Sequence, residues 1–372
     1  MDYEIEFHPV GDASRAGDAI SIRYGVNGAY EIMVVDGGTD DAGSELVEHI
    51  KSFYGSDTVI SHVVNTHPDT DHACGLREIL RNFQVKNLWL HGVWHHADEM
   101  LPYFADKRWT GEGLATAIRD RYPVVKELIE LAEEQGTNIY EPFQGVAIGP
   151  FAVLSPSRWT YLRLVPQFRK TPDHDPEALT ADNMLLGRVE KSGLLGQIVQ
   201  KATAAIRAWV DENWDIELLR ERSITAAENE TSTVLYGRFG DKSVLLTGDA
   251  GVNALTWACN QADARGFDLS TLAMVQVPHH GSRSNVTPSI LDRLLGPKLP
   301  RGSAKRRSAF VSVPKDDENH PRKMVMNAFH RRGAPVYKTQ GVYIRHYSGM
   351  PARRGESAAI PFDWFDKVEE YD

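Results

Sequence analysis

The chain has 372 residues, of which 42% are hydrophobic and 25% are charged, enough for one sizeable domain or two modest ones. No apolar run approaches the roughly eighteen residues that suggest a membrane span, and the acidic N-terminus lacks the basic start and apolar centre of a secretion signal. Two cysteines, Cys74 and Cys259, do not make a disulfide framework. We therefore expect a cytoplasmic protein with no membrane partner.

The net charge of −10 argues against a nucleic-acid partner, but the charge is unevenly distributed. Residues 298–354 hold 14 basic and three acidic residues, a balance of +11, whereas the rest of the chain has a balance of −21. Such asymmetry is a recognised indication of contact with a polyanion. A solvated basic face is the simpler interpretation, and polyanion contact gains support only if this segment borders an active site.

Strands and helices alternate along most of the chain. Alternating hydrophobicity predicts a hairpin, with strands over 19–24 and 30–35 around the turn residues Asn27 and Gly28. Further strands are predicted over 59–65, 87–91, 233–237, 243–247, 274–277, 309–313 and 342–346, and two short strands are predicted within 146–154, around Gly149 and Pro150. Helices are predicted over 44–54, 75–82, 124–135, 252–265, 288–295 and 321–332.

One long segment interrupts this alternation. Residues 157–228 contain several prolines and then a helical pattern over 192–222, which is too long for a simple connection. We expect a helical insertion within a domain that spans 1–348, followed by a tail over 349–372. Strands near both ends of the chain, with helices interspersed, favour an α/β fold in which helices cover two sheets.

The densest group of chemically active side chains follows the strand predicted over 59–65. His67, Asp69, Asp71 and His72 offer four metal ligands within six residues. Neighbouring carboxylates repel one another unless a cation neutralises them, and His with Asp suits zinc, manganese or iron. Capping of turns or helices would explain one or two of these residues but not all four. We therefore predict a metal site here.

Two more predicted strands end in residues of the same kind. The strand over 243–247 leads to Asp249, and the strand over 274–277 leads to His279 and His280. Taken singly, these are ordinary turn, surface or core residues. Three strand ends that each deliver Asp or His fit one site better than three coincidences, because strand ends and their loops carry function in layered α/β folds.

The order of these features resembles the metallo-β-lactamase superfamily, and most closely the hydrolase-like domain of the ComEC DNA-uptake protein and its free-standing relatives. The matching residues, between about residue 5 and residue 346, are Gly17-Asp18-Ala19-Ile20, Asp36-Gly37-Gly38, His67-x-Asp69-x-Asp71-His72, Asn229-x-x-Ser232-x-Val234-Leu235, Leu246-Thr247-Gly248-Asp249, Pro278-His279-His280-Gly281-Ser282, His320-Pro321, Gly333, Thr339 and Gly341. The insertion and the tail lie outside the resemblance. It implies a four-layer αββα sandwich with a helical insertion.

The resemblance also implies a centre for one or two divalent ions, zinc or manganese, with magnesium as a further option. Carried over by position, the first ion is held by His67, Asp69 and Asp249. The ligands implied for the second ion are Asp71, His72, His280 and, as a bridge, the same Asp249.

Two positions depart from the superfamily's commoner pattern. Asp69 stands where a histidine is usual, and Asn229, or Ser232 beside it, stands where another histidine ligand is usual. Both changes replace nitrogen by oxygen at the first ion, which weakens the case for zinc and favours manganese or magnesium. The first site could also be weak or empty, which would leave a one-metal enzyme.

For the mechanism, we expect the ions to activate a water, with Asp71 acting both as a ligand and as the residue that orients it. His279 and His320 are candidates for protonating the leaving group or stabilising the transition state. A hydrogen bond to a carboxylate ligand explains either histidine equally well. The residues expected to contact the substrate are Asn229, Ser282, Lys305, Arg306 and Arg322.

The ComEC-like resemblance implies a nuclease, so our first expectation is hydrolysis of a phosphodiester in DNA or RNA. The basic segment 298–354 includes His320, so we expect part of it to lie near the ions. Phosphate contacts are expected from Lys305, Arg306, Arg307, Arg322, Lys323, Arg331 and Arg332. The alternatives are a small-molecule metallohydrolase, acting on a lactone, lactam, thioester or phosphoester, and a non-enzymatic module stabilised by metal.

The insertion over 157–228 has several candidate roles. It can cover the mouth of the active site, or it can be a proteolysis-sensitive control segment on which a regulatory protein acts. A helix that forms a homodimer is the competing interpretation. An exposed lid without a regulatory role is the simplest alternative.

Overall fold

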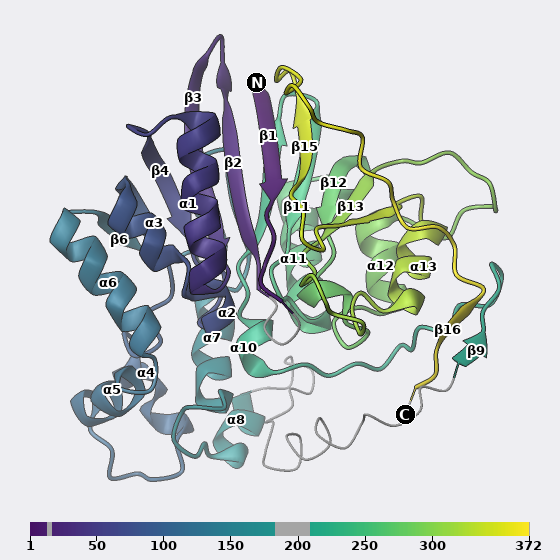
Figure 1. Ribbon diagram of the computed structural model, residues 1–372. Coiled ribbons are helices and arrows are strands. Elements are labelled where there is room, and N and C mark those ends of the chain that lie inside the picture. Colours follow the sequence, from purple (N-terminus) through teal and green to yellow (C-terminus); the bar gives the residue numbers. More distant parts are fainter. Residues whose placement is uncertain (13–16, 183–208, 372) are drawn as a thin grey trace.

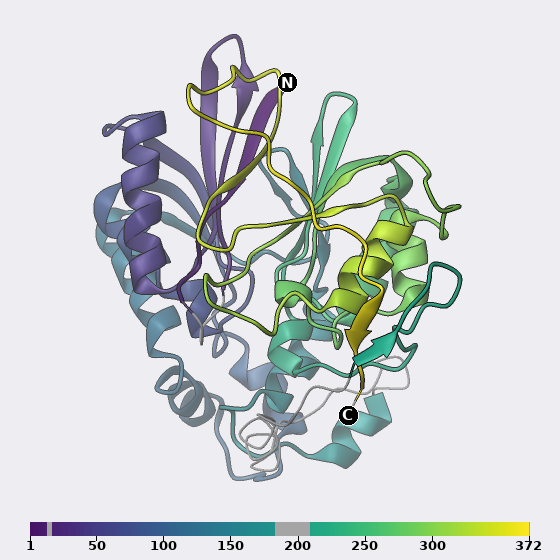
Figure 2. The ribbon, with the colours of Figure 1, turned by 45° about the vertical axis from the view of Figure 1, so that its right-hand side comes forward.

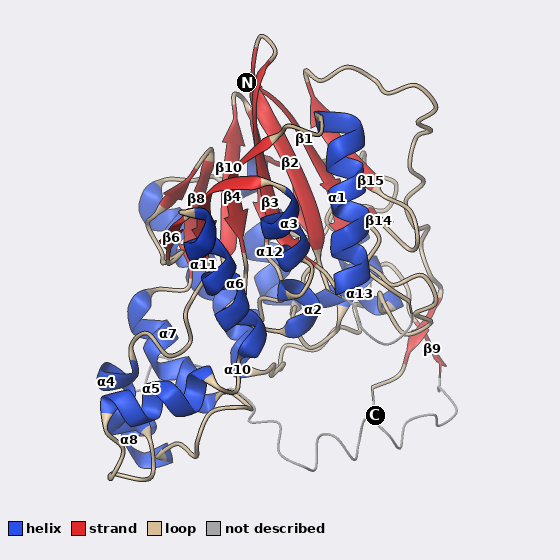
Figure 3. Cartoon of the chain, turned by 60° about the vertical axis from the view of Figure 1, so that its left-hand side comes forward, coloured by secondary structure: helices blue, strands red, loops and turns tan. Residues whose placement is uncertain are grey.

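The computed structural model describes residues 1–12, 17–182 and 209–371. Two seven-stranded sheets lie face to face, and helices cover the outer face of each, as Figure 1 shows. In Figure 3, the strands occupy the middle of the molecule and the helices its outside. The predicted αββα sandwich is therefore confirmed.

The first sheet combines an antiparallel and a parallel half. Its strands, in spatial order, are β15 (Ile344–Ser348), β1 (Asp2–Phe7), β2 (Ala19–Val26), β3 (Ala29–Gly37), β4 (Val59–Val64), β5 (Gln84–Trp89) and β6 (Asn138–Tyr140). The strands from β3 to β6 are parallel, with Val35 paired to Val64 and Val64 to Trp89. Their C-terminal ends therefore lie at one edge of the sheet.

The second sheet repeats this arrangement. Its strands, in spatial order, are β14 (Val336–Lys338), β13 (Ser308–Val311), β12 (Leu272–Gln276), β11 (Lys242–Leu246), β10 (Val234–Phe239), β8 (Phe151–Ser155) and β7 (Ala147–Ile148). The strands from β11 to β14 are parallel, with Val244 paired to Met274. Because the central strands are covered on both faces, β11 and β12 are apolar rather than alternating.

Three apolar layers hold the sandwich together. Residues such as Ile22, Leu235 and Met274 fill the space between the sheets. The helices that cover the first sheet include α1 (Asp40–Tyr54), α3 (Leu76–Asn82) and α6 (Pro123–Gln135), and those that cover the second include α11 (Val252–Arg265), α12 (Pro288–Leu295) and α13 (Lys323–Arg331). Other α-helices of the described residues are α2 (Thr70–Ala73), α4 (Ala97–Met100), α5 (Gly111–Arg119), α7 (Arg158–Leu164), α8 (Pro176–Asp182) and α10 (Ala227–Glu230). Within the described ranges, no helix has both the length and the apolar character required to cross a membrane.

The insertion differs from its prediction. Much of the helix predicted over 192–222 lies outside the described residues, which resume at Trp209. From there to residue 222 the chain forms a short strand, β9 (Trp209–Asp211), and irregular structure, so the helical prediction is wrong over this part. The polar run after Trp214 bonds instead to α13, where the Arg331 guanidinium donates to the carbonyl oxygens of Trp214 and Ile216.

The C-terminal tail packs against the second helical layer. Its strand β16 (Lys367–Glu369) pairs with β9, and Val368 is fully buried among residues of that layer. Figure 2 shows this two-stranded sheet beside the C-terminus. The tail and the last part of the insertion are therefore joined to each other.

Several arginines of the basic segment are buried, and so do not form the phosphate-binding surface predicted for them. Arg307 donates to the carbonyl oxygens of Leu269 and Ser270. Arg332 pairs with Glu217 at 2.8 Å, and its side chain has no exposed surface. Arg331 is equally buried. The prediction of phosphate contacts is wrong for Arg307, Arg331 and Arg332, because local sequence does not reveal the buried partners.

We predict that Arg331→Met destabilises the protein strongly. Arg331 pairs with the fully buried Glu212 at 3.3 Å, and removing one partner of a buried ion pair costs about 3–5 kcal/mol. Urea unfolding measures the loss. Arg293→Ala, which removes an exposed pair with Asp263, should cost less than about 1 kcal/mol. Equal unfolding midpoints for wild type and Arg331→Met would contradict this account.

Candidate metal centre

Strands from both sheets bring the predicted ligands to one edge of the sandwich. His67 follows the end of β4, and α2 begins directly after Asp69, so that its first turn carries Asp71 and His72. In the second sheet, Asp249 follows β11, and the 3₁₀ turn η4 (His279–Gly281) follows β12. Parallel strands that end together thus place these side chains close to one another, as the sequence predicts.

Asp249 lies at the centre of the cluster. Its Oδ1 atom is 3.4 Å from Nε2 of His72 and 3.9 Å from Nε2 of His280. Its Oδ2 atom is 3.9 Å from Nε2 of His67, which is itself 3.8 Å from Oδ2 of Asp69. These separations are long for hydrogen bonds but near the roughly 3.4 Å between two ligand atoms on one tetrahedral zinc. Asp249 is therefore positioned as a bridge.

Asp71 lies on the Oδ1 side of Asp249, the same side as His72 and His280. Ligand atoms of Asp71, His72 and His280 lie within 4.8 Å of one another. The second ion would thus be held by these three residues and Asp249, and the first by His67, Asp69 and Asp249.

Asp36, at the end of β3, orients two of the imidazoles. Its buried carboxylate accepts hydrogen bonds from Nδ1 of His72 at 2.8 Å and from the hydroxyl of Thr66 at 2.6 Å. That hydroxyl in turn accepts a hydrogen bond from Nδ1 of His67 at 3.0 Å. Both rings are fixed so that Nε2 points toward Asp249. Asp36 belongs to the predicted resemblance, but its place at a strand end did not reveal this role.

The buried atoms left without partners fit a cation. His280 is oriented by a hydrogen bond from Nδ1 to the carbonyl oxygen of Ser312. The Nε2 atoms of His67, His72 and His280 and the Oδ1 atom of Asp249 are all buried and have no hydrogen-bond partner. Because buried polar atoms nearly always have a partner, these four atoms indicate a divalent ion, which imidazole and carboxylate ligands suit.

The protonation states of two predicted ligand histidines suit metal binding directly. Burial lowers the pKa of His67 and lowers that of His280 to about 3, so both rings stay neutral and keep the lone pair that a metal needs. At His72, burial lowers the pKa, but the carboxylates of Asp249 and Asp36 outweigh it and raise this pKa well above its ordinary value, so an ion must displace a proton from that ring. Burial alone would raise the pKa of Asp249, but the imidazoles of His279 and His72 outweigh it and hold this pKa well below its usual range. Asp249 is therefore an ionised ligand.

Four other predicted site residues lie at or beside the centre. His320 bonds to Asp317 through Nδ1 at 3.1 Å, and its charge acts on the adjacent His280. The Asn229 amide is 3.0 Å from Nδ1 of His279, in turn η4. Ser282 ends η4, and the backbone nitrogen of Arg322 donates to a carbonyl oxygen in that turn.

Lys305 and Arg306 lie away from the metal centre, so the structure does not bring these two predicted substrate-binding residues together with the predicted ligands. Both residues are exposed and precede β13, which runs parallel to β12. They therefore lie at the end of the sheet opposite the ligands. The Lys305 ammonium donates to the hydroxyl of Tyr337 at 2.9 Å.

An arginine side chain of the insertion, that of Arg169, lies at the metal centre. The Arg169 guanidinium donates to Oδ2 of Asp69 at 2.8 Å and to buried Glu228 at 3.1 Å. Its side chain is 44% exposed, so it lies at the rim of the metal centre. The sequence shows Arg169 only as one of several arginines among prolines, and no local pattern connects it with Asp69, a hundred residues away.

The comparison with protein families agrees with this geometry. Residues 26–151 match the family described as the metallo-beta-lactamase superfamily, a segment that includes His67 to His72 and most of the first sheet. The chain has the metallo-β-lactamase fold. The match supports the superfamily part of the predicted resemblance over residues 26–151. The closer resemblance to ComEC stays a prediction.

Solved structures with the metallo-β-lactamase fold are distant in sequence. A mutant metallo-beta-lactamase from Cronobacter sakazakii is 15% identical, with a TM-score of 0.23, over 38% of this chain and 48% of that one, so the chain spans about half its length. A diphosphatase of the PhnP family is 10% identical over 93% and 98%, with a TM-score of 0.37. Zinc-bound PqqB from Methylobacterium extorquens is 11% identical over 92% and 99%, with a TM-score of 0.40. No curated protein sequence matches the chain.

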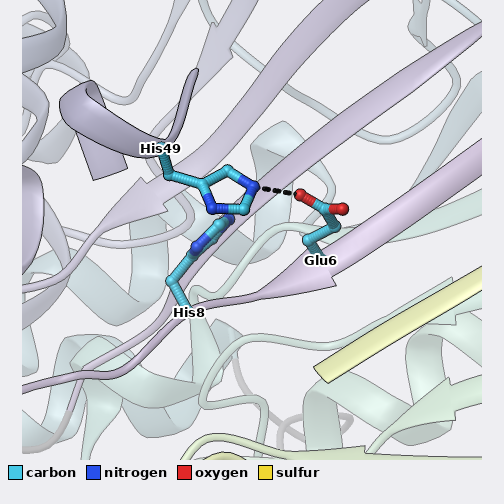
Figure 4. Close-up of side chains that lie close together, drawn as sticks. All are labelled: Glu6, His8 and His49. Atoms are coloured by element: carbon cyan, nitrogen blue, oxygen red, sulfur yellow. Dashed lines mark hydrogen bonds and ion pairs between the residues drawn. The ribbon is translucent and has the colours of Figure 1, made fainter. Parts of the chain in front are cut away.

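A second histidine cluster lies on the first sheet, outside the metal centre of the metallo-β-lactamase fold. Figure 4 shows Glu6 and His8, from β1 and the residue after it, beside His49 from α1. Nε2 of His49 donates to Glu6 at 2.5 Å, and Nε2 of His8 contacts the hydroxyl of Ser21 at 2.8 Å. The three residues have the chemistry of metal ligands.

The charges around this second cluster argue against a metal ion. Glu6 and its buried neighbour Glu4 contact three arginines: Arg23, at 2.7 Å from Glu4, Arg345, at 3.5 Å from Glu6, and Arg353, at 2.5 Å from Glu6. Glu356 also pairs with Arg345, at 2.8 Å, so three arginines already neutralise three carboxylates, and a divalent ion would add uncompensated positive charge. The cluster is therefore a structural ion-pair network.

This network predicts a specific acid sensitivity. Burial raises the pKa of Glu6, but the hydrogen bond and charge of His49, with Arg353, lower it to about 2, from an ordinary value of 4.5. Ionised Glu6 therefore stabilises the fold fully above pH 4.5, and this stability is lost as the pH falls from 4.5 toward 2. Glu6→Gln should lose on the order of 3 kcal/mol at neutral pH and show a flatter dependence below it.

Thermal unfolding, followed by circular dichroism across this pH range, tests the effect of Glu6. Glu48→Gln, on the exposed face of α1, is the control and should keep the wild-type profile. If Glu6→Gln also keeps that profile, Glu6 is not the group whose protonation destabilises the fold.

Proposed function

We propose that the protein is a metal-dependent phosphodiesterase, with DNA or RNA as the expected substrate. The observation that carries the proposal is the position of Arg169, whose partly exposed guanidinium lies directly beside Asp69 at the metal centre. A guanidinium matches the geometry of phosphate oxygens and pairs with them strongly. A phosphodiester bound at the centre would therefore meet a cation supplied by the chain itself.

The residues of the centre have distinct roles in this proposal. A bound divalent ion supplies Lewis acidity and lowers the pKa of a water toward neutrality. Asp71 is half-buried at the start of α2, where its carboxylate can hold and orient that water. His320 is held by Asp317 through Nδ1 and remains partly exposed, so its Nε2 can exchange a proton with the leaving group.

One observation favours the second candidate, a small-molecule phosphoesterase. Arg307, Arg331 and Arg332 are buried, and Lys305 and Arg306 lie at the far end of the sheet. These residues were expected to contact the phosphates of a nucleic acid. Their positions remove most of the basic surface that a long nucleic acid would need beside the metal centre. A short phosphodiester needs only the cation at the metal centre, so substrate length separates the two candidates.

Cleavage assays with matched substrates test the reaction class. We expect hydrolysis of bis-p-nitrophenyl phosphate that EDTA abolishes and that Asp71→Ala lowers by about 10²- to 10⁴-fold in kcat. A plasmid and single-stranded oligonucleotides then show whether polymers are cleaved. Hydrolysis of carboxylic esters or lactones without phosphodiester cleavage would show that the proposal is wrong, and inactivity of the metal-loaded protein on every substrate would favour a non-enzymatic module.

The role of Arg169 has its own test. Arg169→Ala should raise KM for bis-p-nitrophenyl phosphate by about tenfold or more, equivalent to about 1.4 kcal/mol or more of lost binding, and Arg169→Lys should recover part of the loss. Arg293→Ala is a matched control because Arg293 is similarly exposed and also pairs with an aspartate, on the surface of α12. An unchanged KM in Arg169→Ala would remove Arg169 from substrate binding.

A further inference from the structure

The four imidazoles of the metal centre fall into two pairs around Asp249. His72 and His280 face Oδ1, as described above, while Nε2 of His279 lies 3.6 Å from Oδ2, the same oxygen that His67 faces at 3.9 Å. His279 therefore faces the oxygen on the side of the first ion, and ligand atoms of His279, His280 and Asp249 lie within 4.8 Å of one another. Its separation from Oδ2 matches those of the three predicted ligand histidines, which range from 3.4 to 3.9 Å.

The ring of His279 is oriented in the same way as those three rings. Its Nδ1 lies 2.9 Å from Oδ1 of Asn285. The Asn285 amide nitrogen donates to the carbonyl oxygens of Asp249 and Ala250, which fixes the side-chain oxygen toward His279. In the tautomer that donates from Nδ1 to Asn285, Nε2 keeps its lone pair on the side of Asp249, whereas the Asn229 amide nitrogen, 3.0 Å from the same Nδ1, favours the other tautomer. An ion on Nε2 would select the first of these tautomers.

The backbone of η4 is strained in the way needed to present both histidines. His279 and His280 have φ values of 47° and 55°, in the left-handed region that non-glycine residues rarely adopt. Such conformations cost on the order of 1–3 kcal/mol each and persist where the surrounding structure requires them. Here these conformations bring the imidazoles of His279 and His280 to the two oxygens of the Asp249 carboxylate. In an extended backbone, consecutive side chains would point in opposite directions.

Without His279, the first ion has fewer protein ligands than the second. His67, Asp69 and Asp249 provide three protein ligands, whereas the second ion has four. Asn229 contributes no imidazole, and its amide lies against the ring of His279 instead. A proton donor would not need a lone pair aimed at the bridging carboxylate, so the geometry does not favour the role in leaving-group protonation that the sequence suggested for His279.

We propose that His279 is a ligand of the first ion and completes a four-donor site with His67, Asp69 and Asp249. Asn285 is the positioning residue that fixes the ring. The inference rests on the metal centre of the proposed function but not on its substrate.

Cobalt binding tests the proposal without an activity assay. Wild-type protein titrated with Co²⁺ should bind two equivalents, and His279→Ala should retain one tight equivalent, with the other weakened by at least about tenfold. His320→Ala is the control, because His320 is a neighbouring histidine outside the ligand set and should leave both equivalents intact. Two tight equivalents and an unchanged cobalt absorption spectrum in His279→Ala would overturn the assignment.

Proton NMR of the wild-type protein tests the same assignment if His279→Ala does not fold. Each ligand histidine has a protonated Nδ1 held by a hydrogen bond, so the dicobalt protein should show four paramagnetically shifted, exchangeable ring N–H signals in its proton NMR spectrum. Three signals would exclude His279. Failure of phosphodiester cleavage would leave both cobalt results unaffected, so the two proposals fail separately.

Discussion

A buried carboxylate between imidazoles from both sheets is the constraint on which the structure depends. Asp249 comes from the second sheet, whereas His67 and His72 come from the first, and the facing nitrogens have no hydrogen-bond partners. Leaving buried polar atoms unsatisfied costs about 1–3 kcal/mol each, so an ion that binds them stabilises the contact between the sheets as well as the site. We therefore expect metal binding to strengthen the contact between the two sheets at this edge of the sandwich.

The sequence predicts this centre well because its geometry follows from strand direction. The ligands follow β4, β11 and β12, and parallel strands end at one edge, so residues distant in sequence converge without any detailed packing. Helix α12 is predicted with its observed bounds because Thr287 caps it, Pro288 occupies its first turn and its apolar positions share one face. In both cases the determining signal lies within a few residues.

The basic segment shows where local signals fail. Its charge has a buried counterpart elsewhere in the chain: Arg331 and Arg332 pair with Glu212 and Glu217, while Arg345 and Arg353 pair with glutamates of β1. Much of the contrast between a segment of +11 and a remainder of −21 is therefore internal complementarity rather than a surface for a polyanion. The charge pattern alone does not distinguish internal ion pairing from a polyanion-binding surface. Tertiary contacts between residues more than a hundred positions apart decide between them.

The same long-range pairing makes the insertion part of the metal centre. Arg169, near its start, and Glu228, at its end, form an ion pair that brings the two ends together beside Asp69. The next residue, Asn229, contacts the ring of His279. Separation of Arg169 from Glu228 would therefore disturb the ligand Asp69, which Arg169 contacts. It would also disturb the orientation of the His279 ring, which Asn229 contacts. The insertion thus affects the first ion far more directly than the second, whose ligands are oriented by Asp36 and Ser312 within the two sheets.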